Sequence, residues 1–371
     1  MHIVPVTTPR LASEFIRFPH QHYRNDPQWI SPLDDDIRAV FDPKRNSFFS
    51  HGVCTRWLLY DGERIIGRIA AFVNYEKAKA THVGGVGFFE CIDSQDAAFL
   101  LFDTAAAWLR QQGMTAMDGP INFGENEKYW GLLVEGFKPP SLGMNYNPPY
   151  YVQLFEKYGF VKQYDQLTNF LDARVPISER FTKISGWVMR KPGYSFKHFS
   201  YTGREKFFRE FQEIYDDAWS NFENFTPLSL DAIRESFRQM KAIADEKIIW
   251  FAYHKDEPIG FVLCLPDANQ ILKHLHGKMN LWAKLKFLYY RKTTTIDRLR
   301  IIVMGCKKKF QNHGIESALI RCLQDEVLPR HTIKGVELAW VGDFNQKMLA
   351  IHEATGAITD KVHRTYRFTF A

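Results

Sequence analysis

The sequence predicts an α/β (α+β) protein made of two tandem domains, each a mixed, mostly antiparallel sheet flanked by helices. A chain of 371 residues is too long for one average core, which indicates two domains. Two short patterns also occur in both halves, separated by nearly the same number of residues. Gly67 and Gly260 lie in apolar, strand-like segments 193 residues apart, and Gly159 and Gly356 close amphipathic helices 197 residues apart. In each half, consecutive strands precede an alternation of strand and helix.

In the first half, apolar alternation predicts the strands and apolar stripes at helical spacing predict the helices. The stripe that begins at Ala98 and ends near Gly113 is the clearest helix. The elements expected around it are, in order, strands at Trp57–Tyr60, Arg64–Asn74 and Val86–Ile92, a strand at Ala116–Ile121, a helix at Pro149–Tyr158 and a strand at Gln166–Leu171.

The second half repeats this order, and its clearest helix carries apolar residues from Ile315 to Leu323 at helical spacing. The expected elements are a helix at Arg204–Trp219, strands at Ile248–His254, Pro258–Leu265 and Leu299–Gly305, a helix at Ile315–Leu328, a strand at Val336–Val341, a helix at Asn345–Ala354 and a strand at Arg364–Phe370. Pro176, Pro192 and Gly193 mark a linker at 175–199 between domains at 1–174 and 200–371.

The composition narrows the function classes. The 48 basic and 42 acidic side chains leave a net charge of +6, which suits an anionic small ligand but is too weak to predict nucleic-acid binding. The five scattered cysteines form no C-x-x-C pair, so neither a disulfide framework nor a metal site is expected. Without a signal pattern or a transmembrane run, we expect a cytoplasmic protein. The sequence leaves the oligomeric state open.

The most informative motif follows the strand that ends at Gly305. The residues from Lys307 to Gly314, here called the basic turn, contain three lysines and lead directly into the helix that starts at Ile315. Free amide groups and the positive end of the helix dipole meet at such a turn. The sequence therefore predicts a binding site for a phosphorylated ligand.

This arrangement resembles the GNAT superfamily of N-acetyltransferases, present twice in tandem over most of the chain. The superfamily pattern Q/R-x-x-G-x-G/A corresponds to Gln311 through Glu316, with Glu316 in place of the last small residue. A carboxylate there would repel a diphosphate if it faced one, or would point to solvent. The first half has no such glycine after its third strand and carries Phe155 where the second half has His352, so we expect only the second domain to bind the cofactor.

The resemblance implies acetyl-CoA, or another acyl-CoA, as cosubstrate. Backbone groups near Val303 and Met304 would bind the pantetheine arm and polarise the thioester carbonyl. In the place of the usual tyrosine acid stands His352, whose reference pKa of about 6.5 would let it protonate the leaving thiolate near neutral pH. The residues that would hold the cofactor's phosphates and arm in the second domain are Gln311, Asn312, His313, Gly314, Ile315 and Asn345.

Two carboxylates are candidates for the base that deprotonates the acceptor amine. Strand alternation puts Glu337 on the face opposite Val336 and Leu338, and Asp343 follows the end of this strand. Either could act directly or through water, and either could instead be an ordinary solvated or salt-bridged carboxylate.

Two further segments leave alternatives open. The insertion from Asn122 to Pro140 mixes aromatic, amide and carboxylate groups. It could bind a polar substrate through Glu125, Asn126, Tyr129 and Trp130, or form a packed loop over the seam between domains. The stretch 268–296 has six cations and no acid. It could meet a membrane, an anionic partner or the phosphates of CoA, or pack its apolar face on the domain.

The sequence and the resemblance together predict an acyl-CoA-dependent N-acyltransferase, of the acetyl type, in which the amine of a small molecule or peptide attacks the thioester directly. The alternatives are a non-catalytic CoA-binding or regulatory protein on this fold, which Glu316 and the missing tyrosine favour, and an aminoacyl-tRNA-dependent transferase, which only the basic stretch 268–296 favours.

Overall fold

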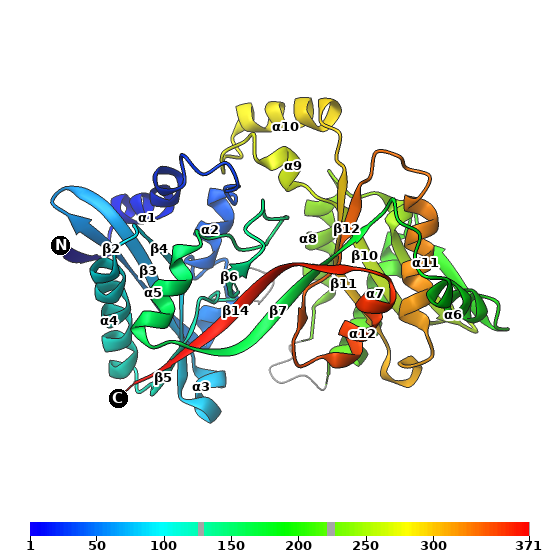
Figure 1. Ribbon diagram of the computed structural model, residues 1–371, viewed down its shortest axis with the longest axis horizontal. Coiled ribbons are helices and arrows are strands. Elements are labelled where there is room, and N and C mark those ends of the chain that lie inside the picture. The colour runs from blue at the N-terminus through cyan, green and yellow to red at the C-terminus, as the bar shows by residue number, and fades with distance from the viewer. Residues whose placement is uncertain (125–129, 221–226, 371) are drawn as a thin grey trace.

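The computed structural model describes residues 1–124, 130–220 and 227–370. In this part of the chain one long, twisted sheet runs through the whole molecule, with helices on both of its faces (Figure 1). The strands follow one another in the order β1-β2-β3-β4-β5-β14-β7-β12-β11-β10-β9-β8, with β13 beside β7 and β6 beside β14. Only β4–β5 and β11–β12 are parallel pairs, and the others are antiparallel.

The strands are β1 (His2–Pro5), β2 (Gly52–Asp61), β3 (Arg64–Asn74), β4 (Val83–Cys91), β5 (Ala116–Gly119), β6 (Leu132–Glu135), β7 (Val161–Asp172), β8 (Tyr194–His198), β9 (Ile249–His254), β10 (Glu257–Pro266), β11 (Arg298–Cys306), β12 (Gly335–Glu337), β13 (Val341–Gly342) and β14 (Ile358–Thr369). The helices are α1 (Pro9–His22), α2 (Asp34–Val40), α3 (Tyr75–Thr81), α4 (Gln95–Gln111), α5 (Tyr150–Tyr158), α6 (Glu179–Met189), α7 (Arg204–Trp219), α8 (Leu230–Met240), α9 (Asn269–Leu272), α10 (Leu281–Thr293), α11 (Ile315–Val327) and α12 (Gln346–Ala354).

The two halves share one plan, as the repeated patterns predicted. In the first half α4 and α5 cover one face of the sheet and α1 and α2 the other, so each face has its own apolar core. In the second half α11 covers one face and α7 and α8 cover the other. Strand alternation supplies both cores, since Ala252 and Val262 face α11 while Phe251 and Phe261 face α7.

The last strand of each half crosses into the middle of the sheet. The final strand of the chain, β14, pairs with β5 of the first half and with β7, and β7 in turn pairs with β12 of the second half. In Figure 1 the two strands run side by side through the centre of the molecule. Because of this exchange, residues of β7 lie next to the expected site in the second half.

The segment 175–199, predicted as a linker, forms two elements. Its first part is α6, which packs on α11, and its second part is β8, which pairs with β9 at the end of the sheet. β8 thus corresponds to β1 of the first half, which pairs with β2. The strand expected at Val336–Val341 was also too long, because β12 ends at Glu337 and β13 is a separate pairing with β7.

Candidate active site

The basic turn has the backbone geometry that an anion site needs. Gly314 is the N-cap of α11 and adopts the left-handed conformation at φ 80°, and Asn312 does so at φ 67°. No side chain caps this helix. The amide groups of its first turn are therefore available to a ligand, and the helix dipole adds positive potential at the same place.

Two of the three lysines of the basic turn have structural contacts. Lys307 is buried and its Nζ binds the carboxylates of Glu213 and Glu257. The backbone amide of Lys308 donates to Asp217 Oδ1 at 2.7 Å. These contacts fix the turn against α7 and its surroundings, so of the three lysines only Lys309 is exposed and free to attract phosphate.

Glu316, the departure from the superfamily pattern, is half-buried in the first turn of α11. Burial raises its pKa, against the weaker opposing effects of Lys347 and His313. It therefore does not simply point to solvent, which was one of the two sequence-based alternatives. A carboxyl with a raised pKa opposes a nearby diphosphate less, because it can take up a proton when the anion binds.

The strand that leads to the basic turn separates from its parallel neighbour. β11 pairs with β12 from Arg298 to Arg300 and not beyond. Among the described strands, the later residues of β11 pair with β10 alone. A bulge on β11, where the register shifts between Ile301 and Val303, turns the backbone just before Met304. The edge of β11 that faces this opening can bind an extended ligand through its backbone.

An unanticipated element, α6, lies across the opening. A Cβ atom built on Gly314 would come within 2.9 Å of Val188 Cγ2 on α6. On the same helix, buried Phe181 packs with Ile320 of α11 and against Met304 and Ile351. The route from the basic turn to the bulge on β11 is therefore covered by apolar side chains of the segment that the sequence analysis assigned to the linker.

A small apolar cavity of about 20 Å³, partly open to solvent, adjoins this cover. It lies next to Ile301 and Val336, beside the point where β11 and β12 separate, and extends along α11. Its lining is almost entirely aliphatic and comprises Leu171, Asp172, Ala173, Val175, Ile177, Ile301, Ile320, Leu323, Gln324, Val327, Leu328, Val336 and Leu338. The space is about that of one water molecule, so an apolar ligand would have to move these side chains apart to enter.

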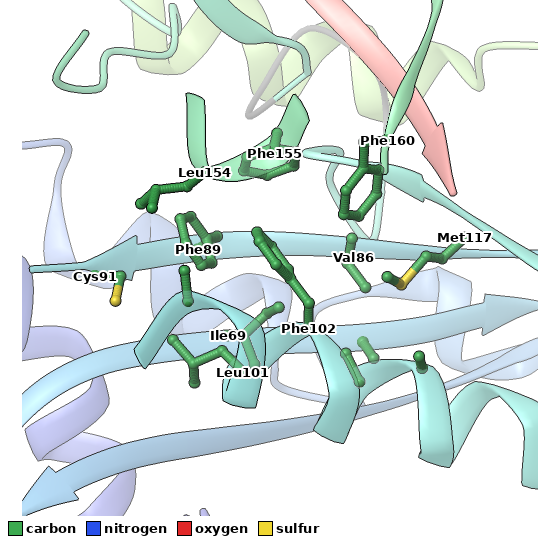
Figure 2. Close-up of a cluster of buried hydrophobic side chains, with 14 of the residues drawn as sticks. Ile69, Val86, Phe89, Cys91, Leu101, Phe102, Met117, Leu154, Phe155 and Phe160 are labelled. Carbon is green, nitrogen blue, oxygen red and sulfur yellow. The ribbon is translucent and has the colours of Figure 1, made fainter. Parts of the chain in front are cut away.

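The corresponding region of the first half is closed. The side chain of Ser94 caps α4 by accepting a hydrogen bond from the amide of Ala97 at 3.4 Å, whereas α11 has no side-chain cap. Figure 2 shows the space between β4, α4 and α5 filled by the rings of Phe89, Phe102 and Phe155. These rings fill the space that corresponds to the expected cofactor site of the second half.

On the other face of the sheet, four central strands carry buried polar side chains, which we call the central polar face. Their cross-strand positions place them on one side, since Arg300 lies opposite Glu337, Lys361 opposite Thr168 and His363 opposite Gln166. These residues come from both halves of the chain. The members are Gln166, Thr168, Arg300, Glu337, Lys361, His363 and Thr365.

Glu337 is the centre of this face and is completely buried. Its Oε2 accepts from Ser141 Oγ at 2.9 Å and from Lys361 Nζ at 3.0 Å, and Oε1 lies 3.5 Å from Arg300 Nε. Burial raises its pKa, but the charges of Lys361, Arg300 and Arg298 outweigh burial and the net pKa is lowered. An ionised carboxylate held in this way is a weak base, so its sequence-based role as general base stays a prediction.

Several polar atoms of the central polar face have no hydrogen-bond partner in the described part of the chain. They are Gln166 Oε1, Thr168 Oγ1 and Thr365 Oγ1, together with Arg300 Nε and Glu337 Oε1, which face each other at 3.5 Å. Buried polar atoms without partners are rare in proteins and often mark functional sites. This group has the capacity to bind hydroxyl or amine groups of a substrate.

His352 is buried on α12, and Asn169 Nδ2 donates to its Nδ1 at 2.9 Å. Its proton therefore sits on Nε2. Burial lowers its pKa to about 4. The residue is uncharged at neutral pH, so the premise that it would be protonated there is not met in this structure. Its role as a proton donor stays a prediction that this pKa weakens.

Acid should destabilise the protein through two buried histidines. Burial lowers the pKa of His352 and of His363 to about 4, whereas an unfolded histidine titrates near 6.5. Between these values the unfolded chain binds more protons, so this stability is complete above pH 6.5 and is lost as the pH falls towards 4. We expect a loss of roughly 3 kcal/mol per histidine over the window.

Urea unfolding at pH 7 and pH 5 measures this effect. His352→Phe, which introduces the residue found at the corresponding position of the first half, should reduce the difference between the two pH values. An unchanged difference in that variant would show that His352 is not held neutral by burial.

The other predicted site residues have ordinary structural contacts. The side chain of Asn345 caps α12 by accepting from the amide of Met348 at 3.2 Å. Asp343 forms an ion pair with Lys162 at 2.9 Å near the surface. The structure thus gives each of them a contact that needs no ligand, and their proposed functional roles remain untested.

Part of the predicted substrate-binding insertion lies outside the described residues, namely Glu125, Asn126 and Tyr129. Trp130 is half-buried, and its indole Nε1 is buried without a hydrogen-bond partner in the described part of the chain. A Cβ atom on the next residue, Gly131, would come within 2.7 Å of Gln166 Oε1. Trp130 is therefore adjacent to the central polar face.

The insertion ends at Pro140, whose carbonyl accepts from Asn269 Nδ2 of the second half at 2.8 Å. The residues that follow it cover the central polar face. Besides the contact of Ser141 with Glu337, the carbonyl of Asn145 accepts from His363 Nε2 at 3.0 Å and the carbonyl of Leu142 accepts from Arg300. Both alternatives for the insertion itself remain predictions.

Sequence reasoning missed Lys361, Asn169 and Ser141. One signal was available, since Lys361, His363 and Thr365 alternate along a strand whose opposite face carries the apolar Val362 and Tyr366. A buried polar row on a central strand suggests a site. The contacts of Asn169 and Ser141 depend on the strand exchange and on the loop conformation, which the sequence does not reveal.

Two absences complete the description. Among residues 1–124, 130–220 and 227–370, no group of three or more His, Cys, Asp or Glu side chains is placed to hold a metal ion. In the same ranges, every helix is too short or too polar to cross a bilayer.

In both halves a strand separates from its parallel neighbour and leads into a helix, and in the second half that helix is capped by a glycine; this plan defines a tandem GNAT protein. The chain belongs to the GNAT acetyltransferase family, and the family model described as "Acetyltransferase (GNAT) family" matches residues 208–357, within the second half. A bacterial ceramide synthase of Caulobacter vibrioides is 31% identical over 99% of this chain and 97% of its own length. Protein YghO of Escherichia coli is 27% identical over 95% and 91%.

Solved structures show the same architecture. A tandem GNAT protein from the clavulanic acid biosynthesis pathway superposes with a TM-score of 0.55 at 11% identity, covering 99% of this chain and 98% of its own. A GCN5-related N-acetyltransferase from Sphaerobacter thermophilus gives 0.53 at 10% identity, covering 99% and 95%. At these identities the likeness establishes the fold alone.

Proposed function

We propose that the protein is an acyl-CoA-dependent N-acyltransferase whose donor carries a long acyl chain and whose acceptor is a long-chain amino alcohol. The observation that carries this proposal is the aliphatic lining of the small cavity beside the point where β11 and β12 separate, which would widen to take an acyl chain. The relative named a ceramide synthase supports it, because a ceramide is an amide of a fatty acid and a long-chain amino alcohol.

Three parts of the second half would each hold one part of the reactants. The open amides at the start of α11 would bind the diphosphate of CoA, and the edge of β11 near Val303 and Met304 would bind the pantetheine arm. The acyl chain would enter the apolar cavity. A backbone amide at the bulge on β11 would donate a hydrogen bond to the carbonyl oxygen of the thioester and so polarise it.

The acceptor would approach from the opposite face of the sheet. On β12, Val336 lines the cavity while its neighbour Glu337 belongs to the central polar face, so the two sites lie on opposite faces of the sheet. The acceptor's amine would reach the thioester where β11 and β12 separate, beyond the pair of Arg300 and Glu337. The uncharged amine would attack the thioester carbonyl carbon, and the carbon–sulfur bond would break. The amine proton would pass to a base, and the CoA thiolate would gain a proton. Gln166 and Thr168 would bind the acceptor's hydroxyl groups.

The test is CoA release measured with a thiol reagent. Donors run from acetyl-CoA to palmitoyl-CoA, and acceptors include sphinganine and the hydrophilic amine spermidine. We expect kcat/KM to rise with donor chain length and to require sphinganine. Turnover of acetyl-CoA alone would reject the long-chain donor but keep the N-acyltransferase. Binding of CoA without turnover of any pair would favour the non-catalytic alternative.

Val336→Phe provides a matched variant, because its ring would occupy the apolar cavity. We expect kcat/KM for palmitoyl-CoA to fall by at least about tenfold, since a filled pocket rejects chains that no longer fit. Turnover of acetyl-CoA in the same variant is the control and should change by less than about twofold. An equal loss with both donors would mean that the cavity does not hold the acyl chain.

A further inference from the structure

The helix α10 presents apolar side chains to solvent. It packs on the domain only through the face that carries Ala283 and Phe287, against Leu272 and Leu275. The exposed fractions on the opposite face are 73% for Leu281, 75% for Trp282, 51% for Leu285, 52% for Leu288 and 62% for Tyr289. At 3.6 residues per turn these positions form one continuous strip, here called the exposed stripe. The sequence-based alternative, in which α10 packs its apolar side chains on the domain, therefore holds for Ala283 and Phe287 but not for the exposed stripe.

Cations surround the exposed stripe. Lys284 and Arg291 flank it on one side of the helix and Lys286 on the other, and Lys292 lies at its C-terminal end. Lys273 and Lys278 precede the helix, and residues 268–296 contain no acid. In the part of the chain that the structure describes, none of these six cations forms an ion pair, although the protein has many elsewhere. Their charge is available to an anionic partner.

We propose that α10 docks the protein on an anionic lipid surface, with the exposed stripe in the interface and the cations at the level of the headgroups. An apolar strip with Trp and Tyr, bordered by Lys and Arg, is the composition of helices that lie in a membrane interface. Anionic headgroups add attraction for each nearby cation. In Figure 1 α10 lies at the outer edge of the molecule, beyond α9, where a flat surface can reach it.

A second copy of the chain fits this face less well. A symmetric dimer through α10 would place two sets of six unpaired cations against each other, and like charges in contact oppose association. The stripe is also convex and without a groove, so it offers no pocket for a peptide. An anionic lipid surface offers acyl chains to the exposed stripe and negatively charged headgroups to the cations beside it.

The docking face is separate from the proposed CoA site. β11 starts shortly after α10 and ends at the basic turn, and nine strand residues span about 30 Å. A docked protein would therefore keep the start of α11 on the water side. This separation lets membrane binding be tested without reference to acyl transfer.

Co-sedimentation of the full-length protein with vesicles tests the proposal. One set is phosphatidylcholine alone, and in the other phosphatidylglycerol replaces a third of it. We expect binding to the anionic vesicles, at least tenfold stronger than to the neutral ones and weakened by salt. The variants Trp282→Ser with Leu285→Ser, and Lys284→Gln with Lys286→Gln, should each reduce binding at least tenfold. Circular dichroism checks that they fold.

Trp187→Ser is the matched control, because Trp187 is also exposed, at 58%, but lies on α6. It should leave vesicle binding unchanged. No binding to anionic vesicles, or binding that both α10 variants retain, would overturn the proposal. If sedimentation instead showed a dimer that Trp282→Ser with Leu285→Ser dissociates, the occupant of the stripe would be a second copy. None of these readouts involves CoA, so they stand apart from the proposed function.

Discussion

Gly314→Val is expected to weaken CoA binding by roughly 100-fold or more, as measured by calorimetry. Gly314 holds φ 80°, which a β-branched residue adopts only under strain, and a Cβ atom there would meet Val188 at 2.9 Å. The substitution would either push the side chain into the diphosphate position or change the backbone that presents the amides. Both outcomes remove the anion site at the start of α11.

The control is Gly113→Val, at the end of α4 in the first half. Gly113 has nearly the same conformation, φ 78°, but a Cβ atom there would meet nothing within 4 Å. Both variants carry the strain of a left-handed valine, so both should lose stability, Gly314→Val somewhat more because of its contact with Val188, and only Gly314→Val should lose CoA binding. Wild-type affinity in folded Gly314→Val would remove the basic turn from the proposed function.

Glu337→Gln is expected to lower the free energy of unfolding by roughly 3–5 kcal/mol, because it removes the buried carboxylate that faces both Lys361 and Arg300 and leaves Lys361 only its contact with Asp360. Glu337 is fully buried, Lys361 is 1% exposed, and the two are joined at 3.0 Å. Lys361→Met alone should cost less, since Arg300 and Ser141 still contact the carboxylate. Urea unfolding at pH 7 measures both losses.

The double variant Glu337→Gln with Lys361→Met should be more stable than the sum of the single losses predicts, by roughly 1–3 kcal/mol. Lys334→Met is the surface control. Lys334 also forms an ion pair, at 2.6 Å with Asp297, but is 67% exposed, so its removal should cost less than about 1 kcal/mol. Additive losses in the double variant would mean that Glu337 and Lys361 are not coupled.

Three helices of the second half, α7, α11 and α12, could be predicted because their signals are local. α7 has the predicted bounds, and α11 and α12 differ from prediction by one residue at one end each. Gly314 was also assigned correctly to the start of a helix, since a glycine in a left-handed conformation after a strand and a turn is encoded within a few residues. The repeat of the plan followed from spacing alone.

The contacts of the site depended on longer-range packing. Glu337 was singled out by alternation, but its partners Lys361 and Ser141 are 24 and 196 residues away in the sequence. Two of the three lysines of the basic turn contact acids of other elements instead of remaining free. Propensity and periodicity cannot specify such pairs, because they depend on how separate elements pack.

The sequence by itself determined the two-fold plan and the place of the basic turn, because strand and helix periodicity and a single glycine express them locally, and the motif from Gln311 to Glu316 carried the resemblance to the GNAT superfamily. Only the tertiary structure decided that β14 and β7 exchange, that α6 covers the opening beside β11, and that an apolar cavity and a buried polar face lie on opposite sides of β12. These features arise from side chains that are far apart in the chain and meet when the sheet assembles. Their arrangement is set by burial and charge pairing, because local preferences do not specify which distant segments come together.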